Sequence, residues 1–319
     1  MPPRYQPVDS SESPRFTGVR TYARCPLSED WAGADVAVLG VPFDSAVSFR
    51  PGARYGPAAV REMSLMMRRW HPSLQVDVFG ELSVIDGGDI ATTPGNAERT
   101  AGQIADALGP VLEGGAVPLV IGGDHSIVLG ELRAHAARHG PVGVVLLDAH
   151  ADTWDSYWGE RYTHGTPFRR ALEEGLIDPH RSLLAGMRGS IYAAADYDEP
   201  REWGFAIVPC DELRTWTPER YAGEVTRRLG EGPAYMSFDV DVLDPPFAPG
   251  TGTPETAGLL PHEALAFLRS LAGRAFVGFD VVEVSPPYDS AGQVTALQAA
   301  TVAFEMLALT AIARRGASS

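Results

Sequence analysis

Short apolar runs of strand length alternate along the chain with longer segments in which apolar residues recur at helical spacing. The predicted strands cover residues 36–41, 117–123, 142–150, 182–187, 205–210, 234–240 and 276–284. The predicted helices cover Pro57–Arg69, Ala97–Glu113, Ile127–His139, Pro218–Leu229, His262–Ser270 and Thr295–Arg314. Nearly continuous apolar strands separated by helices are typical of a parallel sheet that is buried on both faces. The pattern therefore predicts an α/β fold.

The beginning of the chain lacks this periodicity. Residues 1–14 are rich in Pro, Ser, Asp and Glu, and we expect them to be flexible. Residues 15–319 contain no linker of biased composition, no block of like charge and no internal repeat. We therefore expect this part of the chain to form a single α/β domain.

The composition narrows the classes of function. With 26 basic and 41 acidic side chains the formal net charge is -15, which argues against binding to nucleic acid and favours a small cationic ligand. All 26 basic residues are arginines, so mechanisms that need a lysine amine are excluded. The chain has two cysteines, no apolar signal segment and no long uninterrupted apolar stretch. These features predict a cytoplasmic protein that does not span a membrane.

Three of the predicted strands run directly into side chains that bind metal ions. The strand at 117–123 is followed by His125, and two others lead into DAHAD at 148–152 and DVD at 239–241. Ligands of parallel sheets bind at the carboxyl ends of the strands, where these side chains are expected to converge. A single aspartate at a strand end usually caps the next turn, which is our interpretation of Asp124. The predicted metal ligands are His125, Asp148, His150, Asp152, Asp239 and Asp241.

The predicted ligands include four carboxylates. Four carboxylates share a cleft with little water only if cations neutralise them or if their pKa values rise steeply. Two divalent ions balance the charge, and oxygen-rich ligands with two imidazoles favour Mn2+, with Fe2+, Co2+, Ni2+ and Zn2+ as alternatives. A water between two such ions becomes hydroxide near neutral pH, so the chemistry predicted is hydrolysis.

Two further residues have chemistry that the apolar pattern does not explain. Glu283 lies in the strand-like sequence FDVVEV, and because a buried glutamate without a partner is costly, we expect it to meet a cation. His164, in HGTPF, is either a surface or capping histidine or a catalytic group. The pattern of residues leaves both interpretations open.

The order and spacing of these motifs resemble the ureohydrolase (arginase) superfamily. The matching sequences are GGDHS at 122–126, DAHAD at 148–152, HGTPF at 164–168, SFDVDVLDP at 237–245 and VEVSPP at 282–287. Longer stretches at 48–62, 152–178 and 245–259 are similar to the agmatinase branch rather than to arginases proper. The resemblance extends over essentially the whole predicted domain.

The resemblance implies the arginase/deacetylase fold, a single three-layer domain around a parallel sheet of about eight strands. It also implies a homo-oligomer, either a trimer or a hexamer. Finally, it implies two Mn2+ ions that share Asp148 and Asp239, with His125 and Asp152 on one ion and His150 and Asp241 on the other.

The same resemblance implies roles in catalysis. Glu283 is expected to hold the substrate guanidinium and His164 to transfer a proton to the leaving amine; with Asp241 they are the predicted catalytic residues. These roles agree with the chemistry, because a guanidinium carbon is a poor electrophile and its nitrogen leaves well only as a neutral amine. The predicted reaction is the hydrolysis of agmatine to urea and putrescine.

The sequence leaves other guanidino substrates open. Relatives with nearly the same motifs act on 4-guanidinobutyrate, 3-guanidinopropionate, proclavaminate or guanidine. Segments 16–26, 154–163 and 285–289 are expected to form the mouth of the pocket. Arg20 and Arg24 in the first segment favour a substrate tail that ends in a carboxylate, whereas the net charge favours a tail that ends in ammonium. The tryptophans of the second segment, Trp154 and Trp158, either narrow the pocket or lie at an oligomer contact.

Two other functions remain as alternatives, a metal-dependent deacetylase of the same fold and a non-catalytic binding protein. Such deacetylases use one metal ion and a pair of adjacent histidines, whereas GGDHS has one histidine and this chain has a full second set of carboxylates. A binding protein would normally have lost ligands, yet all six are present. Both alternatives therefore fit the sequence less well than a hydrolase.

Overall fold

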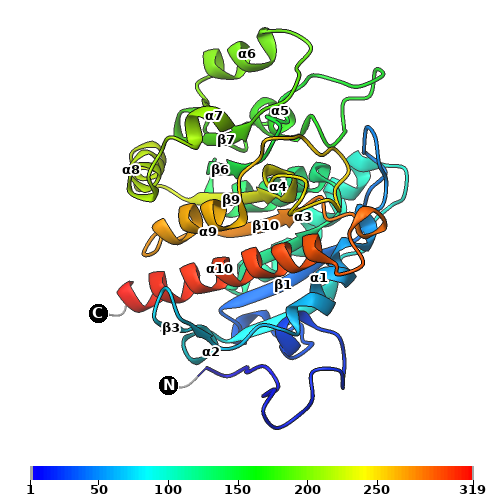
Figure 1. Ribbon diagram of the computed structural model, residues 1–319. Helices are drawn as coiled ribbons and strands as arrows, with labels where there is room; N and C mark the ends of the chain where they lie inside the picture. Colours follow the sequence, from blue (N-terminus) through cyan, green and yellow to red (C-terminus); the bar gives the residue numbers. More distant parts are fainter. Residues whose placement is uncertain (1–2, 318–319) are drawn as a thin grey trace.

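An eight-stranded sheet runs through the middle of the computed structural model, which describes residues 3–317 (Figure 1). Its strand order is β4-β1-β5-β10-β9-β6-β7-β8, and all neighbouring strands are parallel. The strands are β1 (Val36–Val41), β4 (Val84–Asp89), β5 (Val117–Gly122), β6 (Gly143–Leu147), β7 (Leu183–Met187), β8 (Ala206–Pro209), β9 (Ala234–Asp239) and β10 (Gly278–Val282).

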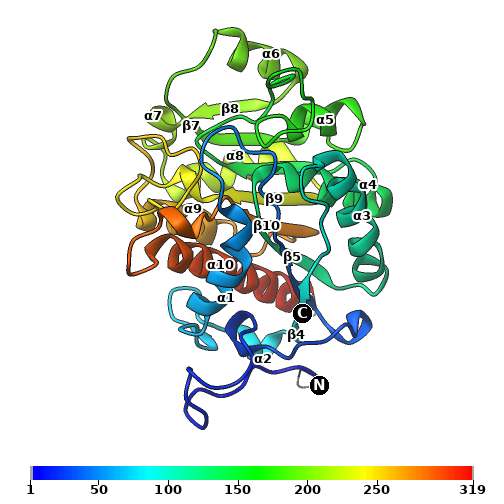
Figure 2. The same cartoon turned by 90° about the vertical axis from the view of Figure 1, so that its right-hand side faces the viewer.

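Helices cover both faces of the sheet, with α1, α8, α9 and α10 on one face and α3, α4 and α5 on the other (Figures 1 and 2). Their bounds are α1 (Gly56–Ser64), α3 (Ala97–Glu113), α4 (Val128–His139), α5 (Pro167–Glu173), α8 (Pro218–Leu229), α9 (Pro261–Ser270) and α10 (Val294–Ala317). The remaining α-helices are α2 (Val78–Glu81), α6 (Ala195–Trp203) and α7 (Cys210–Leu213), and the strands β2 (Trp70–His71) and β3 (Val76–Asp77) form an antiparallel hairpin. This is the predicted three-layer α/β architecture.

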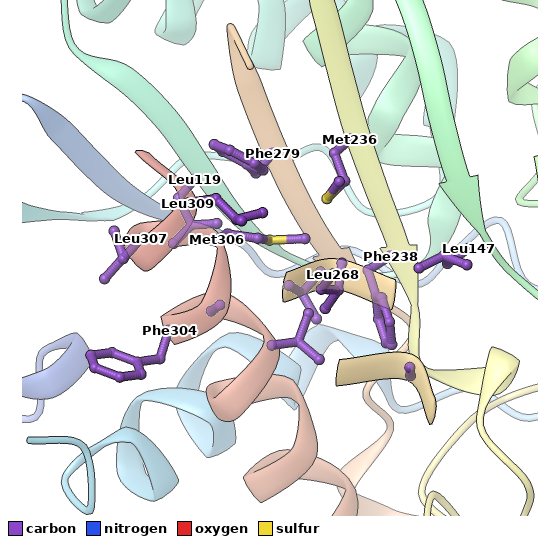
Figure 3. Close-up of a cluster of buried hydrophobic side chains, with 14 of the residues drawn as sticks. Leu119, Leu147, Met236, Phe238, Leu268, Phe279, Phe304, Met306, Leu307 and Leu309 are labelled. Carbon is purple, nitrogen blue, oxygen red and sulfur yellow. The ribbon is translucent and has the colours of Figure 1, made fainter. Parts of the chain in front are cut away.

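The largest apolar cluster lies between the sheet and helices α9 and α10. Figure 3 shows Leu119 of β5, Phe238 of β9 and Phe279 of β10 gathered in this cluster with Leu268 of α9 and Met306 of α10. Each of these side chains is almost completely buried. Burying one such side chain stabilises a fold by about 1.5–3 kcal/mol, so this layer holds the strands that carry the site in fixed register.

Helix α10 is long and apolar enough to cross a membrane if length and composition alone are considered, over Val294–Gly316. However, 72% of its apolar window is buried inside the protein. A helix that is apolar on most of its surface is typical of the core of a large domain. Its composition is therefore explained by its contacts with the sheet.

Seven of the eight strands of the main sheet, counted over residues 3–317, lie within predicted ranges, and β4 is the one that the sequence pattern misses. Its sequence, VIDGGD, has apolar residues only at Val84 and Ile85. Asp86, in the middle of β4, is fully buried because it pairs with Arg61 of α1. An ion pair between distant residues thus stabilises a strand that hydrophobic periodicity does not reveal. The predicted helix Pro57–Arg69 is also too long, since α1 ends at Ser64.

The described part of the N-terminal segment, residues 3–14, lies along the surface beside α2 (Figures 1 and 2). The backbone N–H of Tyr5 donates to Ser83 Oγ at 2.8 Å, and Gln6 donates to the carbonyl of Phe79 at 2.6 Å. Val8 N–H donates to the carbonyl of Arg24 at 3.1 Å. Residues 1–2 lie outside the described residues, and the flexibility expected for 1–14 stays a prediction.

Candidate active site

Four neighbouring strands bring the predicted site residues to one edge of the sheet. Strands β5, β10, β9 and β6 lie side by side. Their carboxyl ends are followed by His125, Glu283, Asp241 and Asp148, and Asp239 is the last residue of β9. These side chains are almost completely buried. The topology of the sheet therefore gathers residues that are up to 158 positions apart in the sequence.

The predicted metal ligands form two adjoining groups. In the first, His125 Nδ1 lies 3.0 Å from Asp148 Oδ2, 2.9 Å from Asp152 Oδ2 and 3.4 Å from Asp239 Oδ2. In the second, His150 Nδ1 lies 3.1 Å from Asp241 Oδ2 and 3.5 Å from Asp148 Oδ1. Asp148 belongs to both groups through different oxygens, whereas the short contact of Asp239 is with the first group alone.

The atoms at the centre of these groups lack partners. His125 Nδ1, Asp148 Oδ2 and Asp241 Oδ2 are buried and form no properly directed hydrogen bond in the described chain. A buried polar atom without a partner costs about 1–3 kcal/mol, and more when it is charged. Nitrogen and carboxylate oxygen atoms that converge in this way are the ligands of hard and borderline divalent ions. The residues present therefore fit a pair of divalent cations.

The pKa values of the carboxyl groups indicate the same need for cations. Burial, together with the charges of Asp241 and Asp148, raises the pKa of Asp239 well above its usual range. Burial and the charge of Asp148 raise the pKa of Asp152 to about 6. Asp148 is the exception, because its contacts with both histidines outweigh burial and hold its pKa below the usual range. The protein's own side chains therefore cannot keep all four carboxylates ionised.

A buried chain of hydrogen bonds orients His125. Its Nε2 lies 2.9 Å from Ser237 Oγ, and that hydroxyl donates to Asp280 Oδ1 at 2.6 Å. Tyr235 donates to Asp280 Oδ2 at 2.7 Å, and its hydroxyl also contacts Glu131. Because the Ser237 hydroxyl proton is directed to Asp280, its oxygen accepts from His125 Nε2, so Nδ1 is the ring atom that faces the carboxylates and would be available to a metal ion.

His164 lies between Ser48 and Glu283. Its Nε2 accepts the backbone N–H of Ser48 at 2.9 Å, and its Nδ1 lies 2.9 Å from Glu283 Oε1. Burial lowers the pKa of His164, but the hydrogen bond and charge of Glu283 outweigh burial and raise it to about 9. When the ring is neutral its proton is on Nδ1; when Nε2 is also protonated, it can donate to Ser48 Oγ, which lies 2.7 Å away. Of the two interpretations left open by the sequence, a surface histidine does not fit this burial.

Glu283 and Asp152 occupy a backbone conformation that is rare for residues with a side chain. Their φ angles are 64° and 50°. Non-glycine residues in the left-handed region cost about 1–3 kcal/mol and concentrate at functional sites. The backbone N–H of Glu283 donates to the carbonyl of Gly123, where a Cβ atom would lie 2.1 Å from the carbonyl oxygen of Phe43. A glycine is therefore required beside the site, which explains the second glycine of GGDHS.

Asp124 has the structural role that the sequence predicts. Its Oδ1 accepts the backbone N–H of Ser126 at 3.0 Å, and its Oδ2 accepts that of Ala46 at 3.0 Å. Burial, with the charge of Glu283, raises its pKa to about 7. Asp124 thus fixes the turn that presents His125.

A cavity of about 230 Å3 opens onto this cluster. Its floor includes His150, Asp152 and His164, and its walls are formed by aromatic, hydroxyl and acidic side chains, among them Ser48, Trp154, Tyr157, Ser190, Tyr192, Thr253 and Glu255. No arginine of the described chain lines it. Glu283 contacts His164 but does not line the cavity, and its Oε2 is buried without a hydrogen-bond partner.

Part of the predicted mouth is wrong. Segment 16–26 does not line this cavity, because Leu27 pairs with Asp86 and holds the segment beside the edge strand β4. Segment 285–289 does not line it either, since Ser285 is buried against the loop of Gly250. Segment 154–163 contributes Trp154 and Tyr157 to the walls, whereas its Trp158 is 75% exposed and lies outside them.

Comparison with known proteins places this arrangement in a family. The model of the arginase family matches residues 34–308. The chain belongs to the arginase family. It is 45% identical over 307 residues to a guanidinopropionase from Pseudomonas aeruginosa, with 96% of each chain covered. It is also 45% identical over 293 residues to the mitochondrial agmatinase of Gallus gallus, covering 92% of this chain and 86% of that protein.

A solved structure gives the same result for the fold of this arginase-family chain. The proclavaminate amidino hydrolase of Streptomyces clavuligerus superposes with a TM-score of 0.90 at 41% sequence identity, covering 94% of this chain and 100% of that one. Arginase-family members are binuclear metal enzymes, which agrees with the two groups of ligands described above. The chain is therefore a hydrolase of this family that acts on guanidino compounds.

The sequence alone does not identify several residues of this arginase-family site. Ser48 and Glu255 lie in stretches 48–62 and 245–259, which resemble the agmatinase branch, but no local pattern marks them as neighbours of His164 or of the cavity. Tyr235 and Asp280 stand inside apolar strand sequences, AYMSF and GFDVV. A polar residue within a predicted buried strand is a usable signal, since such a group must find a partner.

Proposed function

We propose that this protein is a manganese-dependent amidinohydrolase that converts agmatine to urea and putrescine. The single observation that carries the proposal is the convergence of two histidines and four aspartates around buried atoms that lack partners. A deacetylase with one metal ion has no use for the second group of carboxylates. A non-catalytic role does not explain the strained backbone of Asp152 and Glu283, or the burial of His164 beside Glu283.

Two divalent ions held by these residues would supply a hydroxide nucleophile near neutral pH and offset the carboxylate charge. The protein's own groups would position the substrate and move protons. Glu283, buried beside His164 with its Oε2 unpartnered, would accept a guanidinium N–H. His164 would donate the proton that the departing amine needs, from Nε2, once its contact with Ser48 has opened. Proton transfer of this kind contributes about 10²–10⁴-fold to a rate.

The charges around the cavity favour a substrate with a cationic tail. Glu255 is the acidic residue of the cavity wall away from the metal ligands, and its carboxylate forms no ion pair in the described chain. No arginine of the described chain lines the cavity to receive a carboxylate. The aromatic rings of Trp154, Tyr157 and Tyr192 offer faces that also attract an ammonium group. Agmatine, with its terminal amine, fits these features.

A guanidino acid is the second candidate, because the guanidinopropionase relative is 45% identical over 96% of this chain. The hydroxyls of Ser190 and Thr253 in the cavity wall provide neutral donors for a carboxylate. The two candidates predict opposite effects of the charge at Glu255. Removing that charge should weaken the use of agmatine and should favour a substrate with a carboxylate tail.

Release of urea by Mn2+-loaded protein from agmatine, guanidinopropionate, guanidinobutyrate, arginine and guanidine tests the proposal. We expect the highest kcat/KM for agmatine, and we expect Glu255→Gln to lower it by about tenfold, the effect of about 1.4 kcal/mol. Glu160→Gln is the matched control, since Glu160 belongs to the nearby loop but does not line the cavity. The highest kcat/KM for a guanidino acid would establish the second candidate, and no urea from any substrate would refute both.

We further propose that the enzyme is a cytoplasmic homo-oligomer, either a trimer or a hexamer. Its two cysteines, Cys25 and Cys210, are buried and free, which fits a reducing compartment. Phe16, Trp158 and Tyr192 are exposed apolar side chains that an oligomer contact could cover. Sedimentation equilibrium of the purified protein gives the oligomeric state, and a monomer at all concentrations would contradict this proposal.

A further inference from the structure

Arg24 carries a buried charge without an ionic partner. Among residues 3–317, three arginines are at least nine-tenths buried: Arg24 is 6% exposed, Arg61 7% and Arg170 2%. Arg61 and Arg170 each pair with two carboxylates. Arg24 forms no ion pair in this part of the chain, and its Nη1 and Nη2 donate to the carbonyl and hydroxyl oxygens of Ser13, each at 2.8 Å. A buried charge with only neutral acceptors needs a counter-ion.

The backbone at Arg24 is held in a rare conformation. Ala23 and Arg24 both lie in the left-handed region, with φ angles of 48° and 62°. The N–H of Ala23 donates to Ser64 Oγ at 2.7 Å, and the carbonyl of Arg24 accepts from Val8 N–H at 3.1 Å. Strained residues persist only where surrounding contacts fix them, and such residues concentrate at binding sites. These contacts present the Arg24 side chain to the N-terminal segment.

Arg24 lines a cavity of about 570 Å3 between the N-terminal segment and the chain that follows α1. Three other arginines line it, Arg15, Arg68 and Arg69, against one carboxylate, Asp9. Arg69 pairs with an aspartate of β3, but Arg15 and Arg68 form no ion pair among the residues that the structure describes. Arg15 Nε is buried and lacks a hydrogen-bond acceptor. The cavity therefore has an excess of positive charge in a protein whose net charge is -15.

We propose that this cavity binds a small multivalent oxyanion, a molecule that carries a phosphate group or several carboxylates. Guanidinium groups hold such oxygens through paired, charge-assisted hydrogen bonds. The volume lies in the range typical of small-molecule sites. Part of the cavity wall is apolar and leaves room for an apolar part of the ligand; it includes Val8, Leu65 and Phe79. No residue lines both this cavity and the active-site cavity, so the proposal does not depend on the proposed function.

Isothermal titration calorimetry of the full chain tests this site, with inorganic phosphate, pyrophosphate and citrate as probes at constant ionic strength. We expect one equivalent of pyrophosphate or citrate to bind per chain, more tightly than phosphate, because more charges meet the arginines. Arg24→Gln is expected to weaken binding by about tenfold or more. Arg20→Gln is the matched control, because Arg20 pairs with the exposed Glu62 and does not line the cavity.

A second variant keeps the test decisive if Arg24→Gln fails to fold. Arg68 is exposed and lines the cavity, so Arg68→Gln is expected to fold and to weaken binding by about threefold. Absence of saturable binding to the wild type would overturn the proposal, as would equal affinities of the Arg24→Gln and Arg20→Gln variants. A change of oligomeric state in Arg24→Gln, without anion binding to the wild type, would also overturn it, because a second copy would then supply the missing carboxylate.

Discussion

Two acidic clusters with buried carboxylates balance their charge in different ways. The arginine-balanced cluster consists of Arg61, Asp86 and Asp89. Its Asp86 accepts from Arg61 Nε at 2.8 Å and Nη2 at 3.0 Å, and from the backbone N–H groups of Tyr22 and Gly88. Both of its oxygens are therefore satisfied. The metal-centre cluster, defined by the six predicted ligands, retains buried atoms without partners, including Asp148 Oδ2 and Asp241 Oδ2.

The difference teaches how a structural cluster is distinguished from a binding centre. A structural cluster contains its own cation, so removal of one partner leaves a buried charge and destabilises the fold. A binding centre contains ligands whose cation comes from solution, so its integrity depends on that ion. The four predictions that follow test this distinction, from the largest expected effect to the smallest.

Asp239→Ala is expected to lower kcat/KM by at least about 10⁴-fold, because a ligand and its charge are lost from the metal centre. The variant should fold, since Asp239 lies at the end of β9 and its Oδ1 accepts only the N–H of Asp241. Urea release and circular dichroism provide the measurements. A folded variant with more than about a tenth of the wild-type activity would contradict the assignment of Asp239.

Arg61→Met is expected to destabilise the protein by about 3–5 kcal/mol, because Asp86 then remains buried without its cation. Urea unfolding followed by circular dichroism measures the free energy. The metal content should be unchanged, since Arg61 does not belong to the metal-centre cluster. Loss of metal without loss of stability would remove the distinction between the two clusters.

His164→Ala is expected to lower kcat by about 10²–10³-fold while metal content is retained. The reason is that His164 contacts Glu283 and Ser48 but none of the predicted metal ligands. Steady-state kinetics and metal analysis of the same preparation test this. Unchanged kcat across the pH range would remove His164 from proton transfer.

Glu305→Gln should give the smallest effect, one that depends on pH. Glu305 of α10 pairs with His71 and Arg269, and although burial raises its pKa, these hydrogen bonds outweigh burial and lower it. Because the folded pKa is depressed, the ionised group stabilises the fold above about pH 4.3, the ordinary value, and this contribution is lost as pH falls through the folded pKa. We expect the variant to be less stable by about 2 kcal/mol at pH 7.

The difference between wild type and Glu305→Gln should shrink as the pH is lowered from 7 to 3. Urea unfolding at several pH values, with metal-free protein, measures it. Glu12→Gln, at an exposed position outside any ion pair in the described chain, serves as the control. A difference that does not change with pH would mean that the charge of Glu305 is not the source of its contribution.

The sequence predicts the parts of this protein that follow a local pattern. Apolar runs identify seven strands, and polar residues directly after strands identify side chains that the structure brings together, among them His125, Asp148 and Asp241, because parallel topology brings strand ends together. The sequence does not predict strand β4, because the ion pair between its Asp86 and Arg61 joins residues 25 positions apart and follows no periodic pattern. The prediction that segment 16–26 lies at the mouth fails for a related reason. The position of this segment is set by an isolated β-bridge between Leu27 and Asp86 of β4, which no local pattern reveals.

The most direct test of the central claim is the metal content of the purified protein, measured by inductively coupled plasma mass spectrometry after saturation with Mn2+ and removal of free ions. The account predicts about two ions per wild-type chain, about two in Arg61→Met and at most about one in Asp239→Ala. Full urea release by protein that contains no divalent metal after chelation would contradict it.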